Sequence, residues 1–148
     1  MTGVDTNVLV RFLIADDPKQ EARAASFFAR AAAEGERLFV PQIVVCELVW
    51  VLSYAYDKSR SEIAAGLETL LRARQLTFEE VDQILSALER FAAGDGDFAD
   101  WLIWERSRAA GVTGVPTFAA DGRGVVGAQP YEVLEQLVQA AGAVVRAD

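Results

Sequence analysis

The chain has 148 residues, 52% of them hydrophobic, and its 22 acidic and 14 basic side chains give a formal net charge of −8. This length and composition fit one domain with its own core, and the acidic balance argues against binding nucleic acid through a broad basic face. Histidine is absent and Cys46 is the single cysteine, which excludes Ser-His-Asp and Cys-His catalysis, histidine-ligated zinc, an intrachain disulfide framework and a C-x-x-C redox pair.

In the first half of the chain, strand and helix signals alternate. Residues 3–13 indicate a short strand running into a helical segment, and an aspartate pair before Pro18 is typical of a helix start. That helix is expected to reach about residue 33 and to stop at Gly35. Residues 37–41, "RLFVP", predict a short buried strand, and residues 42–56 repeat their apolar positions at helical spacing.

In the second half, two patterns of the capping-box type each predict a further helix: Ser59-x-x-Glu62 and Thr77-x-x-Glu80. The later elements depend on glycine and proline as boundaries. They are a glycine-rich loop and helix over residues 94–111, a strand over 112–118, a turn at Asp121-Gly122, a strand over 124–127 and a helix from Pro130 to about Ala141.

Strands separated by helices predict an α/β fold. We expect a three-layer α/β/α sandwich with a mostly parallel central sheet and helices on both faces. Sheets of this kind place their functional sites at the carboxyl ends of the strands.

Membrane insertion is not expected from the sequence. No apolar stretch reaches the roughly 18 to 20 residues that a membrane-spanning helix needs, and the first residues lack the basic flank of a signal peptide. We therefore expect a soluble, cytoplasmic protein.

Three groups of acidic residues need a physical explanation. Asp5 lies near the end of the first predicted strand among apolar residues, where uncompensated burial of a charge costs several kcal/mol. Glu47 lies in a helix that is apolar almost all round, and a glutamate is seldom buried without a partner. Asp95, Asp97 and Asp100 gather at a predicted helix start, the last two on one face of the first turn.

Each acid also has a purely structural interpretation. Asp5 could accept backbone hydrogen bonds in a turn, and Glu47 could pair with an arginine. Asp97 could be an ordinary N-cap, with Asp100 complementing the helix dipole. Taken together, the acids favour a shared divalent cation, because Mg²⁺ and Mn²⁺ prefer hard oxygen ligands.

A cation held by such acids would make the hydrolysis of a phosphodiester possible. It would lower the pKa of a bound water, so that hydroxide is available near neutral pH to attack a phosphodiester in line. It would also stabilise the negative charge that develops on the phosphate oxygens. Arg11 is the basic residue nearest to Asp5 in the sequence and is a candidate substrate contact.

Three blocks of the sequence, "VDTNVLVRFL", "VPQIVVCELVWVLSYAY" and "GDGDFADWLIWERSRAAG", resemble the motif blocks of PIN-domain ribonucleases of the VapC toxin type. The resemblance covers about residues 1–111, in the same order and at similar spacing. It implies a Mg²⁺- or Mn²⁺-dependent endoribonuclease that is usually a homodimer and is held inactive by a small antitoxin protein. The catalytic residues that it implies are the metal ligands Asp5, Glu47 and Asp100 and the accompanying Asp97, with Thr6 and Asn7 at the border of the site.

The last quarter of the chain departs from that family pattern. Family members commonly place a fourth acid directly after a "TF" pair, where this chain has Ala119. Asp121 follows two residues later, which is about 6 to 7 Å along a strand. Asp121 is therefore a candidate site residue displaced from the usual position, and we expect weaker metal binding or slower cleavage.

Residues 111–142 resemble a second family, the closing strand-hairpin-helix segment of DsbA-like thioredoxin folds. In "GVTGVPTFAADGRG", Pro116 matches the proline beside the redox site of that family. The expected organisation is one domain over residues 1–148, with a PIN-like body over 1–111 and an atypical C-terminal segment over 112–148. That segment is either of thioredoxin-like origin, natural or engineered, or a chance match in a divergent PIN protein.

Three functional hypotheses follow from these patterns. The first is the metal-dependent ribonuclease, and the second is a catalytically silent scaffold or binding module, which includes an engineered chimera. The third is a remnant thiol oxidoreductase, which requires a reactive Cys46 with a low pKa. Trp50, Trp101 and Trp104 are expected to be core or dimer contacts rather than platforms for stacking bases.

Overall fold

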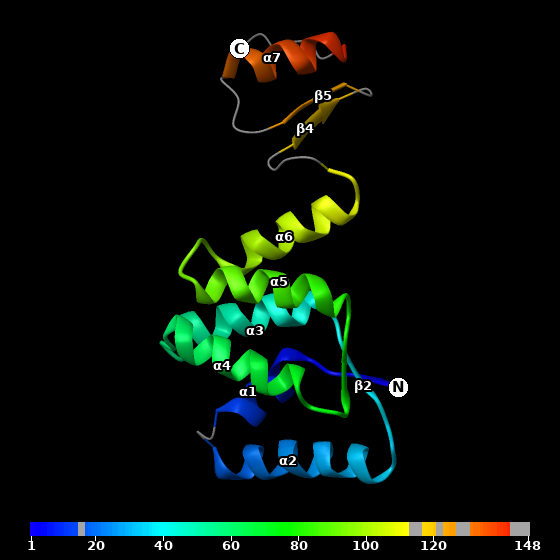
Figure 1. The fold of residues 1–148 in the computed structure, drawn as a ribbon, viewed down its shortest axis with the longest axis vertical. Helices are drawn as coiled ribbons and strands as arrows, with labels where there is room; N and C mark the ends of the chain where they lie inside the picture. Colours follow the sequence, from blue (N-terminus) through cyan, green and yellow to red (C-terminus); the bar gives the residue numbers. More distant parts are fainter. Residues whose placement is uncertain (15–16, 113–116, 121–122, 127–130, 143–148) are drawn as a thin grey trace, which may run out of the picture. The chain divides into compact units, whose positions relative to one another are not determined.

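The computed structural model describes residues 1–14, 17–112, 117–120, 123–126 and 131–142. Figure 1 shows its helices and strands in chain order. They are β1 (Thr2–Gly3), α1 (Thr6–Leu13), α2 (Pro18–Ala33), β2 (Leu38–Val40), α3 (Gln42–Tyr54), α4 (Arg60–Leu71), β3 (Leu76–Phe78), α5 (Val81–Ala92), α6 (Phe98–Ala109), β4 (Thr117–Ala120), β5 (Arg123–Val126) and α7 (Tyr131–Ala140).

The chain divides into two compact units, Met1–Leu102 and Ile103–Asp148, and the boundary falls inside α6. The first unit contains a three-stranded sheet in the order β1-β2-β3, and both strand pairs are parallel. In the register of the sheet, Leu38 of β2 lies opposite Thr2 on one side and Leu76 on the other. The predicted α/β fold with a parallel sheet is therefore confirmed, and it agrees with a PIN-like fold.

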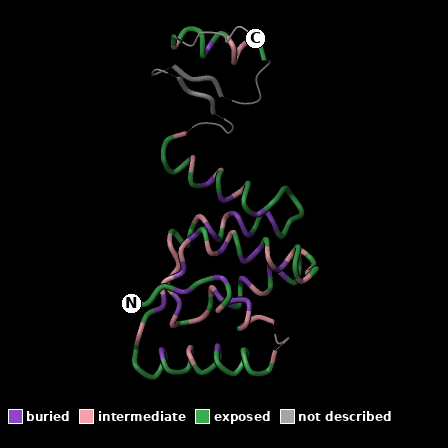
Figure 2. The backbone as a smooth tube through the Cα atoms, turned by 180° about the vertical axis from the view of Figure 1, so that it is seen from behind, coloured by how far each residue is buried: buried purple, intermediate pink, exposed green. Residues whose placement is uncertain are grey.

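The core of the first unit lies between the sheet and its helices. In α5 the buried residues recur at helical spacing, Ile84, Ala87, Leu88 and Phe91, so that one stripe of the helix faces inward. Figure 2 shows buried positions of this kind along the facing sides of neighbouring helices. The packing of α3 on α4 and of α4 on α5 extends this core away from the sheet. This packing holds α3 in place, and the contact of Phe98 with Phe91 of α5 joins the start of α6 to the same core.

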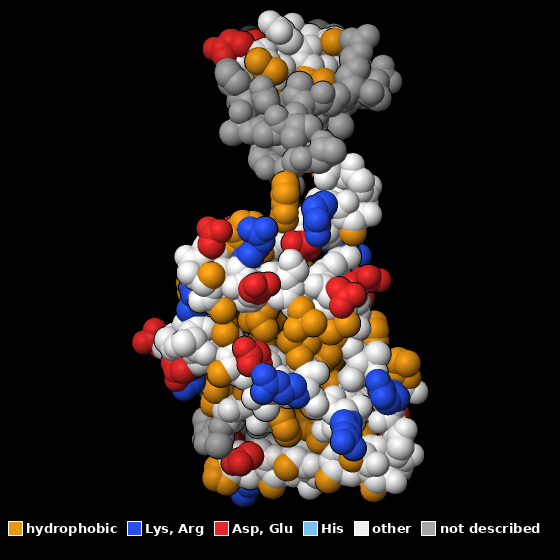
Figure 3. Space-filling view, viewed as in Figure 1, with side chains coloured by type: hydrophobic (Ala, Val, Ile, Leu, Met, Phe, Trp, Pro, Cys, Tyr) orange, Lys and Arg blue, Asp and Glu red, His pale blue; other side chains and the backbone are white. Residues whose placement is uncertain are grey.

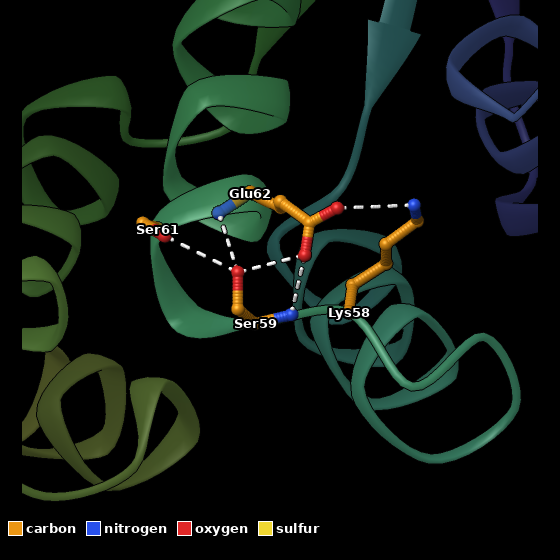
Figure 4. Close-up of polar contacts among 4 residues, drawn as sticks. All are labelled: Lys58, Ser59, Ser61 and Glu62. Atoms are coloured by element: carbon orange, nitrogen blue, oxygen red, sulfur yellow. Dashed lines mark hydrogen bonds and ion pairs between the residues drawn. The ribbon is translucent and has the colours of Figure 1, made fainter.

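The start of α4 forms the predicted capping box, drawn in Figure 4. The backbone N–H of Glu62 donates to Ser59 Oγ at 3.3 Å, and the backbone N–H of Ser59 donates to Glu62 Oε2 at 2.9 Å. Lys58 Nζ donates to Glu62 Oε1 at 3.1 Å. The Ser59 hydroxyl also donates to Glu62 Oε2 at 2.7 Å. This bond, followed by those from the Ser59 backbone N–H and from Lys58, lowers the pKa of Glu62 from 4.5 to about 2.

Replacing the cap is expected to weaken the fold and to release this pKa. Ser59→Ala removes a hydroxyl that both accepts from and donates to Glu62, so the free energy of unfolding should fall by about 1 kcal/mol. The pKa of Glu62 should rise toward 4.5 in the variant. Urea denaturation and an NMR titration of Glu62 measure the two effects. Ser26→Ala, on the exposed side of α2, is the control and should stay within about 0.5 kcal/mol of the parent.

The pH dependence of this contribution has a definite sign. Because the folded pKa of Glu62 lies below its ordinary value, ionisation of Glu62 stabilises the fold fully above pH 4.5. The contribution is lost as the pH falls from 4.5 toward about 2. If the parent and the Ser59→Ala variant lost the same free energy of unfolding between pH 4.5 and about 2, the lowered pKa of Glu62 could not be assigned to the Ser59 cap.

The second predicted capping box is wrong. Thr77 lies in β3, opposite Phe39 in the parallel ladder, and its Oγ1 accepts from Arg37 Nε at 3.0 Å. Glu80 is itself the N-cap residue of α5, with φ of 46° and no side-chain cap bond. Strand pairing with a distant segment has therefore replaced the local helix signal, and the helix starts one residue after the glutamate.

In the second unit, β4 and β5 form an antiparallel hairpin in which Thr117 lies opposite Val126. Helix α7 packs against both strands and buries Leu137. A strand, a hairpin partner and a final helix occur here in the predicted order, but β4 shares only Thr117 and Phe118 with the strand predicted over 112–118. The turn at Asp121-Gly122 and Pro116 lie outside the described residues, and the thioredoxin-like origin of this segment stays a prediction.

Candidate active site

Asp5 lies where the chain leaves β1 and enters α1. Its backbone is extended, with φ −91° and ψ 170°, and its Oδ1 accepts from the backbone N–H of Val8 at 3.0 Å. Asp5 is therefore the N-cap of α1 and is exposed. The expectation that it is buried was wrong, because the apolar residues around it in the sequence point to the core while the cap position faces solvent.

Thr6 joins this helix start to α3. It is only 6% exposed, and its hydroxyl donates to Glu47 Oε2, across 41 positions of the chain. Glu47 itself is exposed, so it too is not the buried acid that the sequence suggested. Its partner is a hydroxyl on a neighbouring helix. The structure thus places Glu47 beside the N-terminus of α1, which Asp5 caps.

Glu47 is exposed because it lies on a face of α3 that no other described element covers, and that face carries apolar residues as well. Ile43, Trp50 and Tyr54 are 74%, 60% and 75% exposed. The Trp50 and Tyr54 rings contact each other, with centroids 5.6 Å apart. Trp50 was expected to be either a core residue or a dimer contact. Its exposure shows that it is not a core residue.

The acids of the third block, Asp97 and Asp100, lie at the start of α6, and both are exposed. The segment before them is attached to α4 by Arg60. Its Nη1 donates to the carbonyl of Phe91 at 2.8 Å and to that of Gly96 at 2.7 Å, and its guanidinium lies 4.4 Å from the centroid of the Phe91 ring. The position of these acids is thus determined by contacts with α4 and α5.

The loop ahead of α6 has one conformation that requires glycine. Gly96 has φ of +60°, and a Cβ there would lie 3.1 Å from Trp101 Nε1. That indole N–H donates to the carbonyl of Asp95, and the guanidinium of Arg90 lies 4.5 Å from the centroid of the Trp101 ring. Trp101 is half-buried, and its hydrogen bond to Asp95 joins the first turn of α6 to the loop that precedes it.

The predicted acids form two pairs in this structure. Asp5 and Glu47 are linked through Thr6, and Asp97 and Asp100 share the start of α6. Among the described residues, no group of three or more acidic or cysteine side chains lies close enough together to hold a metal ion. The exposed carboxylates are nevertheless the donor chemistry that Mg²⁺ and Mn²⁺ prefer.

The fourth position of the expected site belongs to the second unit. Ala119 lies in β4 opposite Gly124. Asp121, the tentative substitute, lies outside the described residues.

A groove of about 410 Å³ opens between α1 and α2 beside Asp5. Arg11 reaches it from α1 and donates from Nη1 to Tyr56 Oη at 3.4 Å. Its lining residues are Asp5, Asn7, Val8, Arg11, Gln20, Arg23, Ala24 and Phe27. A candidate catalytic acid, its neighbour Asn7 and two guanidinium groups therefore share one concave surface.

Two sequence matches show the family of the chain. The PIN domain model matches residues 4–121. The chain belongs to the PIN-domain family. It is also 32% identical over 118 residues, 80% of this chain and 87% of the relative, to a VapC ribonuclease of Aquifex aeolicus (strain VF5). The PIN match extends past residue 111 to include β4, whereas α7 lies beyond it.

Another hollow of this PIN-domain protein is larger than the groove beside Asp5. It has a volume of about 600 Å³ and lies between α4 and α5, lined by apolar residues such as Leu71, Val81 and Leu85. Figure 3 shows hydrophobic side chains gathered over this part of the surface. None of the predicted site residues lines it, so it is not the candidate active site.

The thiol hypothesis is not supported by the environment of Cys46. The side chain is half-buried, and burial raises the pKa of its thiol. A reactive cysteine needs the opposite shift. Separately, the helices formed by described residues include none with both the length and the hydropathy for crossing a membrane.

The sequence did not indicate two features of the site. One is the Thr6–Glu47 hydrogen bond, since Thr6 was expected only at the border. The other is Arg23, which lies on α2, a helix outside the three motif blocks. Arg23 could have been found only by knowing that α2 packs against α1.

Proposed function

We propose that this PIN-domain protein is a Mg²⁺- or Mn²⁺-dependent endoribonuclease, the toxin of a toxin–antitoxin pair. The observation on which the proposal depends most is the Asp5–Thr6–Glu47 arrangement, two solvent-facing carboxylates brought to one helix start from separate motif blocks. The name of its relative, a VapC ribonuclease, supports RNA as the substrate. The same likeness supports a small antitoxin protein as partner, and we extend the proposal to a cytoplasmic homodimer.

In this proposal Asp5 and Glu47 would hold the ion, and Asp100, accompanied by Asp97, would have to approach them to complete its ligands. The described residues do not bring three of these acids close enough together to hold a metal ion. The bound ion would supply hydroxide near neutral pH and neutralise charge on the phosphate. The chain's own contribution is to orient the ligands. The Val8 N–H fixes one oxygen of Asp5, and the Thr6 hydroxyl fixes one oxygen of Glu47.

The test is cleavage of a fluorescent single-stranded RNA by the purified full chain. We expect cleavage with Mn²⁺ or Mg²⁺ and none in EDTA. Calorimetry of Mn²⁺ binding to the parent and to Asp100→Asn then asks whether the third block is part of the site, with weaker binding expected in the variant. A folded protein that binds Mn²⁺ in neither form and cleaves RNA with neither metal would instead be the silent scaffold. Because Ala119 replaces the usual fourth acid, weak Mn²⁺ affinity is expected in the parent as well.

The hydroxyl of Thr6 is expected to matter for activity more than for stability. Thr6→Val keeps the shape of a buried side chain but releases Glu47, which is exposed and can be hydrated. Loss of such an orienting contact typically costs about 10–100-fold in metal affinity or activity. Thr6→Ser retains the donor and should recover most of the rate.

Single-turnover cleavage rates and urea denaturation of the three proteins separate the two effects. An active Thr6→Val protein with the parental rate would show that the hydrogen bond to Glu47 does not serve the reaction. A Thr6→Ser protein as slow as Thr6→Val would show the same.

A further inference from the structure

The groove beside Asp5 does not end at α1. A second hollow of about 460 Å³ lies along α2, and its lining includes Ser26 and Arg30. The two hollows share Arg23 and Phe27 in their linings, so they adjoin each other. We name these two adjoining hollows together the α1–α2 trough; its lining residues extend from Asp5 to Arg30.

The charge of the α1–α2 trough is opposite to that of the chain. Arg11, Arg23 and Arg30 line it, and Asp5 is its one acid among the described lining residues. The whole chain has a net charge of −8. A basic surface in so acidic a protein is local, and it adjoins a candidate catalytic acid.

The geometry of the arginines suits an extended anionic chain. Arg23 and Arg30 are exposed and lie seven positions apart on α2, about two turns or roughly 10 Å along the helix axis. That spacing favours contacts with different phosphates of one strand. Arginine is well suited to this role because its planar guanidinium binds phosphate oxygens through two parallel hydrogen bonds.

An aromatic residue in the lining of the trough and an acidic residue beside it also affect what the trough can bind. Phe27 is half-buried, contacts the Phe28 ring at 5.7 Å between centroids, and presents an aromatic surface on which a base could stack. Asp17 is one acid close enough to interact electrostatically with Arg11, but its Oδ1 already accepts from the backbone N–H groups of Lys19 and Gln20. These bonds engage Asp17 as the N-cap of α2.

We propose that the α1–α2 trough binds the sugar–phosphate backbone of single-stranded RNA on one side of the phosphate to be cleaved. The inference rests on the proposed ribonuclease function, and it adds where the substrate lies and which residues hold it. Arg23 and Arg30 contact phosphates, and Arg11 lines the same hollow as Asp5. An acidic peptide is the competing ligand, because it too would be attracted by three arginines.

The test measures RNA binding without cleavage. The parent and Arg23→Gln/Arg30→Gln are titrated with a fluorescein-labelled 12-nucleotide RNA of mixed sequence in EDTA, by anisotropy, at several salt concentrations. We expect a rise in Kd of at least about tenfold. The slope of log K against log salt should shrink by about 1.4, because each phosphate contact to a single strand contributes about 0.7.

The matched control removes the same charge elsewhere. Arg72→Gln/Arg74→Gln changes two exposed arginines outside the trough, at the end of α4 and just after it. This control should stay within about twofold of the parental Kd and keep the parental salt slope. Circular dichroism checks that all proteins are folded.

Three outcomes would overturn the inference. They are no RNA binding by the parent, equal losses in the trough variant and the control, and displacement of the RNA by polyglutamate as readily as by unlabelled RNA. Because no divalent metal is present, these results are independent of cleavage. If the parent cleaves RNA with Mn²⁺ but its RNA affinity does not depend on Arg23 and Arg30, the inference fails and the proposed function stands. If the RNA affinity depends on these arginines but the parent never cleaves RNA, only the proposed nuclease activity is refuted.

Discussion

Asp5→Asn is expected to lower RNA cleavage at least a hundredfold while leaving the fold intact. Asn is as good an N-cap residue as Asp, so the bond from the Val8 N–H to the side chain of residue 5 can persist. What disappears is the negative charge that a divalent ion would need. Loss of a direct ligand should cost more than the roughly 10–100-fold that loss of a supporting contact costs.

The measurement is the initial rate of cleavage at saturating Mn²⁺, together with urea denaturation. Asp82→Asn is the matched control, because Asp82 is also an exposed acid in a first helical turn but lies on α5. It should retain the parental rate. An Asp5→Asn protein that cleaves at the parental rate would remove Asp5 from the reaction and with it the proposed site.

Local signals in the sequence were sufficient for much of the fold. The proline start of α2, the apolar spacing of α3 and the capping box at Ser59 each act within a few residues, and the structure has all three. Thr77-x-x-Glu80 has the same local pattern, yet Thr77 pairs with Phe39 in the sheet. A long-range partner decides between strand and helix there, and a pattern of four residues contains no information about it.

The same distinction holds for the candidate site. The sequence could indicate Asp5 and Glu47 as acids in apolar surroundings, but it could not indicate their exposure. An apolar helix such as α3 exposes whichever face its neighbours leave uncovered, and here that face includes Glu47 and Trp50. The contact from Thr6 to Glu47 depends on the packing of α1 against α3, which no local spacing encodes.

Phe98→Ala is expected to have the largest effect on stability, and it connects the core to the acids at the start of α6. Phe98 is 1% exposed, and its ring meets the Phe91 ring edge-on, with centroids 6.1 Å apart and planes at 88°. Truncating a buried phenylalanine costs about 3–5 kcal/mol of unfolding free energy, since the lost burial is followed by an unfilled cavity. The edge-on ring contact contributes about 0.5–1.5 kcal/mol of such a loss.

Because Phe98 stands between Asp97 and Asp100, the cavity should also loosen the first turn of α6 and reduce cleavage even where the protein remains folded. Phe98→Leu fills most of the space and should cost less than about 2 kcal/mol, with activity largely kept. Leu85→Ala, at an exposed position of α5, is the surface control and should change stability by less than about 1 kcal/mol. Urea denaturation and cleavage rates at a temperature where every variant is folded measure both effects. If Phe98→Ala were no less stable than Leu85→Ala, the start of α6 would not be anchored by this side chain, and the positions of Asp97 and Asp100 would need another cause.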